Sequence, residues 1–260
     1  MIKLTQNPET TAFDIAEAIS QDQALASKVL RIANSAYYGF PQKITTINYA
    51  IVLLGLNNIR NIVLSTSVIE QLPDTDKTLF DCREFWKHSF LCGIISKKIA
   101  EHLGMKTSEE IFMCGLLHDF GKLVLYHFFH EEFVQALSIA KAENISLQEA
   151  ENRVFNFNHS GVGALLFKKW QLPLSLVKSI EHHHHPDNSF DYFRIASIVH
   201  VANYLCRRIG IGSSGDAIIP SLEKKSYKLV NLTSAKIKKM SRQITSEFKQ
   251  AIEFLDDKEI

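Results

Sequence analysis

The stretch from Asp81 to Leu103 is the part of the sequence that most constrains the fold. Five of its side chains recur every three or four residues, the period of one face of an α-helix. They are Phe85, His88, Cys92, Ile95 and Ile99. Gly104 follows directly and is a typical helix terminator. The stretch predicts a helix of about six turns. Because no segment of useful length alternates apolar and polar residues as a strand does, we predict an all-α fold.

Further helices are expected on both sides of this one. Before it they cover residues 14–19, 22–33, 47–54 and 56–72, and after it residues 174–182, 193–209 and 234–255. Two more begin at capping boxes, in which a Ser or Thr is followed three residues later by Glu. These boxes are Thr107 to Glu110 and Ser146 to Glu149, and another helix starts after residues 158–160.

The polar turn at residues 72–77, which contains Pro73, is the best boundary between lobes. We therefore expect an N-terminal helical lobe over residues 1–73 and a second helical lobe over 80–210. Residues 211–260 begin with a loop rich in Gly and Ser and continue into a basic amphipathic helix. Such a helix is usually a solvated face over an apolar stripe, and a nucleic-acid role for it is the weaker interpretation.

Composition limits the classes of partner. Among 260 residues, 29 Lys and Arg balance 28 Asp and Glu, so no overall field attracts nucleic acid or a membrane. The four cysteines stand apart among apolar residues, which favours reduced thiols in the core. No apolar run approaches the roughly 20 residues that span a bilayer. The expected location is the cytoplasm.

Histidines supply the strongest chemical signal. Most of the eleven fall at helix ends in the second lobe, at His88, His118, His159 and the run 182–185, and Asp119 directly follows His118. Imidazoles and a carboxylate form a ligand set for Fe, Mn, Zn or Ni. Because adjacent residues on a helix point about 100 degrees apart, other helices must bring the remaining ligands to the His118–Asp119 pair.

Two motifs make the sequence resemble a known family. His118 to Lys122, read with an earlier histidine in the segment 85–89, is similar to the HD superfamily of metal-dependent phosphohydrolases. The first lobe, through residues 14–19, 28–39 and 44–55, resembles the HDOD domain, the HD-related output domain of bacterial signalling proteins. The similarity covers about residues 10–210. It implies a two-lobed helical domain that usually acts in regulation and often lacks the full catalytic set.

The resemblance also implies a ligand set. By comparison with the related HD-GYP phosphodiesterases, which hydrolyse cyclic di-GMP, the metal ligands in order are His88, His118, Asp119, His159, His182 and His183. Glu84 matches an additional carboxylate of some three-metal members, and Lys122 matches a lysine that would face substrate phosphate. Asp119 and Lys122 are the expected catalytic residues. The expected cofactor is a divalent transition metal, Fe or Mn ahead of Zn or Ni, with room for two ions.

Two departures from the enzymes lower the expectation of catalysis. Asn203 stands where HD enzymes have their final metal-binding aspartate, and a neutral amide is a poorer ligand. The residues after the histidine run, 185–191, contain no Gly-Tyr-Pro, so recognition of cyclic di-GMP does not carry over.

Of the other histidines, five are expected at the surface or behind the ligands: His102, His127, His130, His184 and His185. His200 is expected either behind the ligands or in the core.

Three functions remain open. The first is a non-catalytic signalling module that binds metal and acts through a protein partner. The second is a working metal-dependent phosphodiesterase or phosphohydrolase, with a cyclic nucleotide or another phosphoester as its ligand. The third is a nucleic-acid binder that uses the basic C-terminal helix, which the near-zero net charge disfavours.

Overall fold

The computed structural model describes residues 80–233 without a break, together with 11–21, 25–26, 29–30, 33–34, 42, 44–56, 59, 63, 236–237, 240 and 244. In these residues every regular element is a helix, as the sequence predicts, and none is a strand. The α-helices are α2 (Ala12–Ser20), α4 (Ile47–Leu54), α6 (Cys82–His102), α7 (Ser108–Leu117), α8 (Phe120–Phe128), α9 (His130–Glu143), α10 (Leu147–Phe155), α11 (His159–Lys169), α12 (Leu174–His182), α13 (Phe193–Ile209) and α14 (Lys224–Val230). A 3₁₀ helix, η1 (Pro186–Tyr192), joins α12 to α13.

The chain divides into two compact units. The first contains residues 1–71 and 238–260, and the second contains residues 72–237. The expected boundary at 210 differs from this division, since the loop after α13 and helix α14 belong to the second unit. The predicted helix over 234–255 lies almost entirely outside the described residues, as do most of those predicted over 22–33 and 56–72.

In the first unit, α2 and α4 pack on a small apolar core. Thr11 and Asp14 form a capping box that starts α2, and the helix then buries Ile15 and Ile19. Ile47 and Ala50 of α4 join the same cluster of buried side chains. This unit supplies no histidine or cysteine, and so no chemistry of the kind expected in the second.

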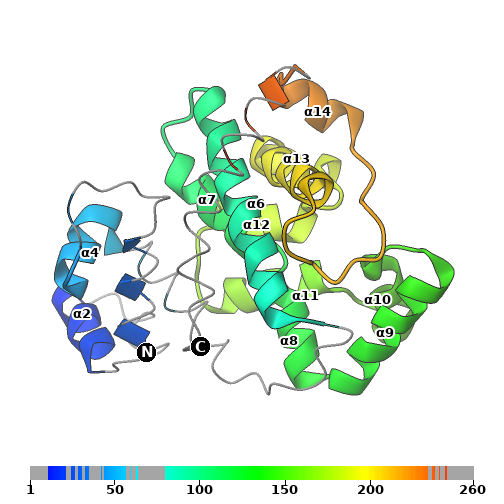
Figure 1. Cartoon of the computed structure of the whole chain (residues 1–260), viewed down its shortest axis with the longest axis horizontal. Coiled ribbons are helices and arrows are strands. Elements are labelled where there is room, and N and C mark those ends of the chain that lie inside the picture. The colour runs from blue at the N-terminus through cyan, green and yellow to red at the C-terminus, as the bar shows by residue number, and fades with distance from the viewer. Residues whose placement is uncertain are drawn as a thin grey trace. The chain divides into compact units, whose positions relative to one another are not determined.

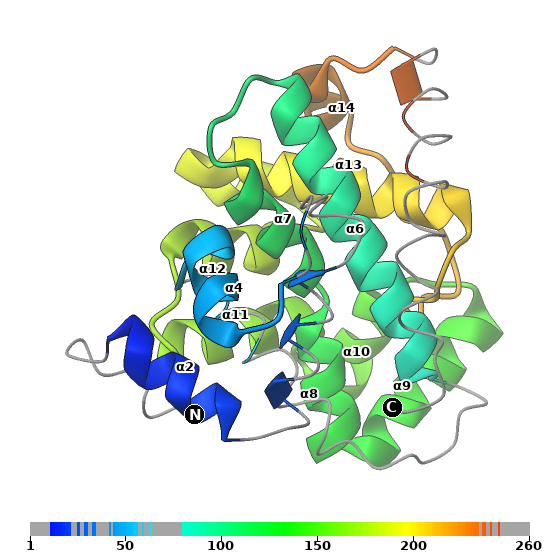
Figure 2. The ribbon, with the colours of Figure 1, turned by 60° about the vertical axis from the view of Figure 1, so that its left-hand side comes forward.

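The second unit is built around α6, which runs through its middle in both ribbon views (Figures 1 and 2). Asp81 caps its N-terminus by accepting the backbone N–H groups of Arg83 and Glu84. Over its 21 residues α6 packs against α7 on one side and α13 on another, and α8 packs against α11. Helix α12 packs against α7 and α11. Together these helix contacts bring the ends of α7, α11 and α12 to one buried region.

The two predicted capping boxes have different outcomes. Ser146 accepts the backbone N–H of Glu149 and caps α10 as expected. Helix α7 begins after Thr107 as expected, but Thr107 makes no side-chain cap because its φ and ψ of −99° and 32° are not extended. Glu110, the other member of that box, accepts a hydrogen bond from Ser175 of α12 instead.

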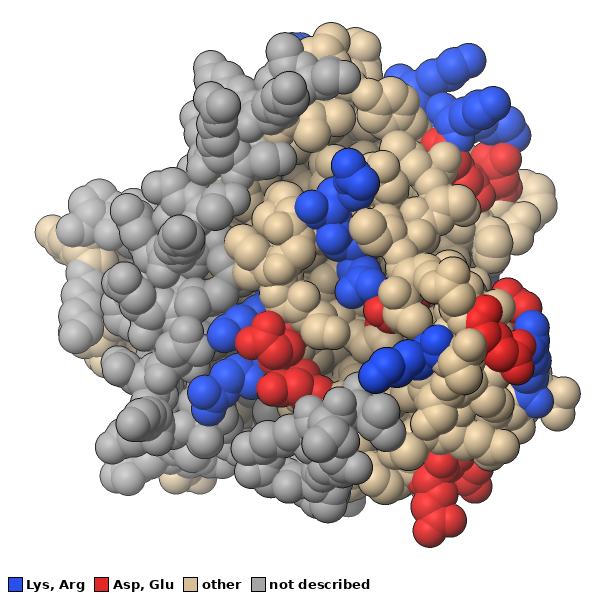
Figure 3. Space-filling model, turned by 45° about the vertical axis from the view of Figure 1, so that its right-hand side comes forward, with Lys and Arg blue, Asp and Glu red and all other residues tan. Residues whose placement is uncertain are grey.

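Charge is mixed on the described surface. Figure 3 shows Lys and Arg groups beside Asp and Glu groups at several places on one face, in keeping with the net charge of +1. No helix among the described residues is long and apolar enough to cross a membrane.

Gly121 allows α8 and α11 to approach. A Cβ at this position would lie 1.9 Å from the backbone oxygen of His159 and 2.9 Å from the backbone nitrogen of Gly163. Both neighbours are backbone atoms, so neither can rotate away. The glycine that follows the His118–Asp119 pair therefore has a packing role: it lets the helix that carries His159 lie against the helix that follows Asp119.

We expect Gly121→Ala to lower the free energy of unfolding by about 3 kcal/mol or more, because overpacking against backbone costs at least as much as in an ordinary core. Urea denaturation measures this. Gly161→Ala is the matched control: it lies in α11, where an added Cβ meets nothing within 4 Å, and should gain up to about 1 kcal/mol of helix propensity. Equal stability of the two variants would contradict the packing role.

Candidate metal centre

His118 and Asp119 form the corner between two helices. Helix α7 ends at Leu117 and α8 begins at Phe120, so these two residues alone make the turn, and both are fully buried. At this corner the Asp119 carboxylate meets imidazoles from three other segments. Its two oxygens face different groups, which divides the surrounding side chains into two sets.

The first set faces Oδ2 of Asp119. His118 Nε2 lies 3.2 Å from this oxygen, and His88 Nε2, from α6, lies 3.8 Å from it. All three side chains are at most 1% exposed. Their ligand atoms lie within 4.8 Å of one another, close enough to hold one ion.

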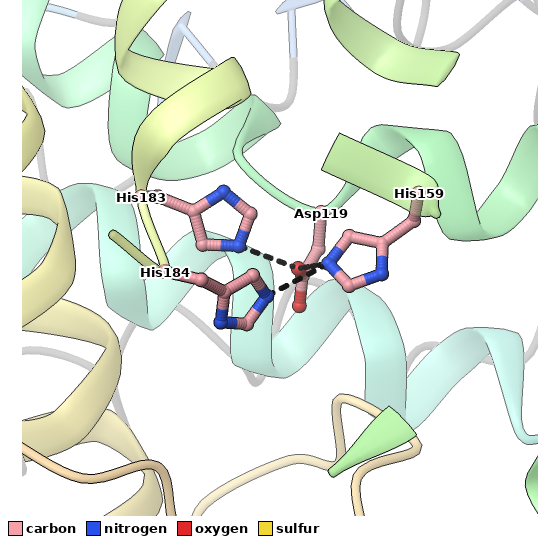
Figure 4. Close-up of side chains that lie close together, drawn as sticks. All are labelled: Asp119, His159, His183 and His184. Atoms are coloured by element: carbon pink, nitrogen blue, oxygen red, sulfur yellow. Dashed lines mark hydrogen bonds and ion pairs between the residues drawn. The ribbon is translucent and has the colours of Figure 1, made fainter. Parts of the chain in front are cut away.

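The second set faces Oδ1 of Asp119 (Figure 4). His159 Nε2, at the start of α11, lies 3.3 Å from this oxygen, and His183 Nε2, just after α12, lies 3.4 Å from it. His184 completes the set, with its Nε2 2.9 Å from Nε2 of His159. The four ligand atoms again lie within 4.8 Å of one another. The structure thus brings together five of the predicted ligands in two sets that share one carboxylate.

The imidazoles are oriented as metal ligands usually are. Nδ1 of His118 donates to the carbonyl of Gly115 at 2.8 Å, and Nδ1 of His183 donates to that of Ile180 at 2.8 Å. Each bond leaves Nε2 as the nitrogen with the free lone pair. Among the described residues, Nε2 of His88, His118 and His183 and Oδ1 of Asp119 are buried without a hydrogen-bond partner.

Buried polar atoms without partners are costly in a folded protein. Here several converge, all are lone-pair donors, and imidazole with carboxylate suits Fe, Mn, Zn or Ni. The residues present therefore fit a divalent metal, with His88, His118 and Asp119 as one ligand set and Asp119, His159, His183 and His184 as the other.

Burial and charge set the protonation of the cluster. Burial, with repulsion from His118, lowers the pKa of His88 to about 3, and burial lowers that of His183 to about 4. Burial acts against protonation of His159 too, but the carboxylates of Glu151 and Asp119 outweigh it and raise its pKa to about 9. For Asp119, burial opposes ionisation, while His118 and Lys122 hold its pKa well below the ordinary value.

Lys122 is fully buried and has an acceptor for each N–H. Its Nζ donates to Oδ2 of Asp119 at 2.8 Å, to Oδ2 of Asp216 at 2.7 Å and to the carbonyl of Ser214 at 3.1 Å. The expectation was that Lys122 faces a substrate phosphate. In this arrangement its donors are instead used within the chain, and it neutralises two carboxylates.

The loop that supplies Asp216 is fastened against α6. Ser213 donates its backbone N–H to the carbonyl of Glu84 at 2.9 Å. Gly212 has φ +73°, and a Cβ there would lie 2.3 Å from the backbone nitrogen of His88. We call residues 212–216 the strap. The strap ties the segment after α13 to the helix that carries His88.

Asn203 lies on the face of α13 that turns toward the cluster. On this face His200 Nδ1 lies 2.8 Å from the carbonyl of His183, and Cys206 Sγ lies 3.3 Å from Nδ1 of His88. Asn203 is three residues from each, so it shares their face between these two contacts. It is buried, and its Oδ1 has no hydrogen-bond partner among the described residues. That Asn203 is a metal ligand stays a prediction, and its amide brings no charge.

Besides Asn203, two predicted ligands lie outside both sets. The Glu84 side chain is 39% exposed and pairs with Lys87 at 3.1 Å. His182 is the last residue of α12 and is partly exposed, with its Nε2 3.5 Å from Glu181. His183 keeps helical φ and ψ of −63° and −21° and continues the buried face of Ile180, so it faces Asp119 while His182 does not.

The remaining histidines divide as follows. His184 was expected at the surface or behind the ligands, and the structure instead includes it in the second set. His102 and His185 are exposed, while His127 and His130 are partly buried outside both sets. His200 is buried behind His183 and combines the two roles left open for it.

Two further residues of the site escaped the sequence reasoning. Glu151 of α10 is fully buried and accepts both the backbone N–H and Nδ1–H of His159, at 2.9 and 2.6 Å. Asp216 lies in a Gly- and Ser-rich stretch that suggests only a loop. A buried acid eight residues before His159 could have been suspected from the apolar face of its helix, whereas nothing local marks Asp216.

Removing Asp216 should strongly destabilise the protein. We expect Asp216→Ala to cost about 3–5 kcal/mol in the free energy of unfolding, because it leaves part of the charge of buried Lys122 uncompensated. Urea denaturation gives this value. The control is Asp187→Ala, which breaks an exposed pair with Lys225 and should change stability by at most about 1 kcal/mol. If the two variants unfold alike, the strap is not held by Lys122.

Acid should destabilise the metal-free protein. His88 and His183 have pKa values of about 3 and 4 in the fold, below the value of 6.5 for an unperturbed histidine. The unfolded chain therefore takes up protons that the fold excludes, and stability is complete above pH 6.5 and falls as the pH drops toward 4. His159 has a raised pKa, so its contribution changes only above pH 6.5.

Between pH 6.5 and 5 the expected loss is on the order of 2 kcal/mol per histidine. Urea denaturation in the presence of a chelator measures it. His183→Asn should flatten the profile, and His102→Asn, at an exposed position, should not. A profile that is flat in the unsubstituted protein would contradict the burial of neutral imidazoles.

Comparisons with solved structures agree with this helical architecture. An HDOD domain protein of Geobacter sulfurreducens is 25% identical, with a TM-score of 0.75 over 97% of this chain and 89% of its own. A candidate phosphohydrolase of Shewanella amazonensis SB2B is also 25% identical, with a TM-score of 0.70 and the same coverage.

Sequence comparisons give the family. An uncharacterised protein of Treponema pallidum (strain Nichols) is 28% identical over 204 residues, which are 78% of this chain, and the match spans 39% of that relative's length. The family model of the HDOD domain matches residues 1–186. This match extends over well more than half of the sequence and includes the His118–Asp119 corner, so the chain belongs to the HDOD domain family.

Proposed function

We propose that this chain is a regulatory module of bacterial signal transduction that binds divalent metal at the Asp119 cluster and acts on a protein partner. The observation that carries the proposal is the convergence of unpartnered lone pairs on one shared carboxylate. Imidazoles alone would repel one another once protonated. A cation between them and Asp119 satisfies both the charge and the lone pairs.

The ligand chemistry suggests Fe or Mn first, with Zn or Ni as further fits. Two ligand sets on one carboxylate suit two ions. Five of the six side chains in these sets are at most 1% exposed, and His184 alone is partly exposed. A buried metal of this kind suits a structural or regulatory role, since its occupancy changes the packing of four helix ends.

Three features favour regulation over catalysis. The donors of Lys122 are used by Asp119, Ser214 and Asp216, so none is left for a substrate phosphate. Asn203, at the position where HD enzymes have their final aspartate, adds no carboxylate charge. The near-complete burial of the ligand atoms limits the room for a phosphoester beside them.

Metal-dependent phosphoester hydrolysis is the second candidate, and one observation favours it. Asp119 joins two ligand sets through its two oxygens, the arrangement that a two-metal hydrolytic site needs. Bound metal ions would supply Lewis acidity and an activated water there. In such a reaction Asp119 would hold the ions together, and a cyclic nucleotide or another phosphoester would enter past His184. The Shewanella protein at 25% identity is a candidate phosphohydrolase, which supports hydrolysis as the second candidate function.

Metal analysis combined with a hydrolysis assay tests the proposal. Protein purified without a His-tag, then loaded with Mn²⁺ or Fe²⁺, should retain metal and gain about 2.7 kcal/mol of stability at a concentration 100 times the Kd. His183→Ala should lose most of this gain, and exposed His102→Ala should keep it. A generic phosphodiester and a panel of cyclic dinucleotides should not be turned over.

Two results would overturn the proposal. Failure of the unsubstituted protein to bind any of these metals would remove the metal site. Turnover that disappears in His118→Ala would replace the regulatory module by a hydrolase. Activity that appears only in Asn203→Asp would support the proposal, since it would identify the neutral amide as the change that disabled the site.

A further inference from the structure

The two oxygens of Asp119 have different partners. Oδ2, which faces His88 and His118, also receives a hydrogen bond from the ammonium of Lys122 at 2.8 Å. Oδ1 faces His159 and His183 and has no hydrogen-bond partner among the described residues. An ion in the first set would therefore share its carboxylate oxygen with a cation, while an ion in the second set would not.

The hydrogen-bond partners of the histidine Nδ1 atoms also favour metal binding in the second set. His159 is held by the carboxylate of Glu151, which lies 2.6 Å from Nδ1 and is fully buried. In the first set, Nδ1 of His118 meets a neutral carbonyl at 2.8 Å, and Nδ1 of His88 lies 3.3 Å from the Cys206 thiol. A carboxylate behind a histidine makes the imidazole a stronger donor and commonly contributes 10- to 100-fold in metal affinity, whereas neutral partners contribute less.

The ligands themselves add to this inequality. The second set offers three imidazoles with Asp119, and the first offers two. Asp216 offsets part of the Lys122 charge through its own contact at 2.7 Å. The hydrogen bond from Lys122 nevertheless occupies one lone pair of Oδ2, so the metal affinity of the first set remains the lower.

One effect opposes the inequality. Glu151 also favours a proton on His159, and a metal ion must displace that proton. Glu151 attracts a divalent ion with twice the charge of a proton, so the balance still favours the metal.

We propose that the two ligand sets bind metal with unequal affinity, in order: the set of Asp119, His159, His183 and His184 fills first, with Glu151 as its positioning residue, and the set of His88, His118 and Asp119 fills second. This inference rests on the metal binding proposed above. It makes the module a graded responder, because the first ion is held at low metal concentration and the second binds only as the concentration rises.

Titration of the metal-free protein with Mn²⁺, with free Mn²⁺ followed by electron paramagnetic resonance, tests the order. Two classes of site are expected. His184→Ala should remove the tighter class, and His88→Ala should remove the weaker class and leave the tighter one. A single bound ion that is lost in His184→Ala and kept in His88→Ala is the limiting form of the same result.

Glu151→Gln tests the positioning role while keeping the size of the side chain. It should weaken the tighter class by about 10- to 100-fold and leave the weaker class unchanged. A merely structural role would disturb both classes together. The matched control is Glu149→Gln, the same change on the same helix at an exposed position paired with Arg153, which should alter neither class.

The outcomes separate the two proposals. Absence of any Mn²⁺ binding overturns this inference, and absence of Fe²⁺ binding as well overturns the proposed function. Equal affinities, loss of the tighter class in His88→Ala, or equal weakening of both classes in Glu151→Gln overturns the inference while the proposed function stands. If Glu151→Gln does not fold, the His88→Ala and His184→Ala pair still decides the order.

Discussion

The contacts of one buried carboxylate organise the second unit. Asp119 meets imidazoles from α6, from its own corner, from α11 and from the end of α12, and it also pairs with Lys122 of α8. A buried charge is tolerated only when it is paired and hydrogen-bonded. Each of these segments must therefore keep its position relative to the others, or Asp119 is left with uncompensated charge in a low-dielectric interior.

The packing serves this requirement. Gly121 lets α11 approach α8 so closely that His159 reaches Asp119, and the strap brings Asp216 to Lys122 from far along the chain. In the absence of metal, the proton favoured on His159 by Glu151 supplies the positive charge beside Asp119. A divalent ion would replace that proton with a stronger charge at the same place, so metal occupancy and the stability of this unit are physically linked.

The arrangement fits the regulatory role proposed above for a phosphohydrolase-like scaffold. The shared carboxylate and the imidazoles form two candidate ligand sets, but Lys122 is engaged by the strap and the amide of Asn203 carries no charge. Chemistry needs an accessible substrate site and a well-charged pair of ions. Coupling between metal and fold needs only the ligands, and these are present.

The sequence by itself determined the helical class and the bounds of helices such as 174–182 and 193–209, because helical periodicity is a local signal. The resemblance to the HD superfamily indicated most members of the two candidate ligand sets. Only the tertiary structure decided the rest. In a run of four histidines, adjacent side chains point in different directions, so the end of α12 selects His183 and His184 over His182. Glu151, Asp216 and the engagement of Lys122 depend on contacts between segments up to 94 residues apart, and no local pattern records such contacts.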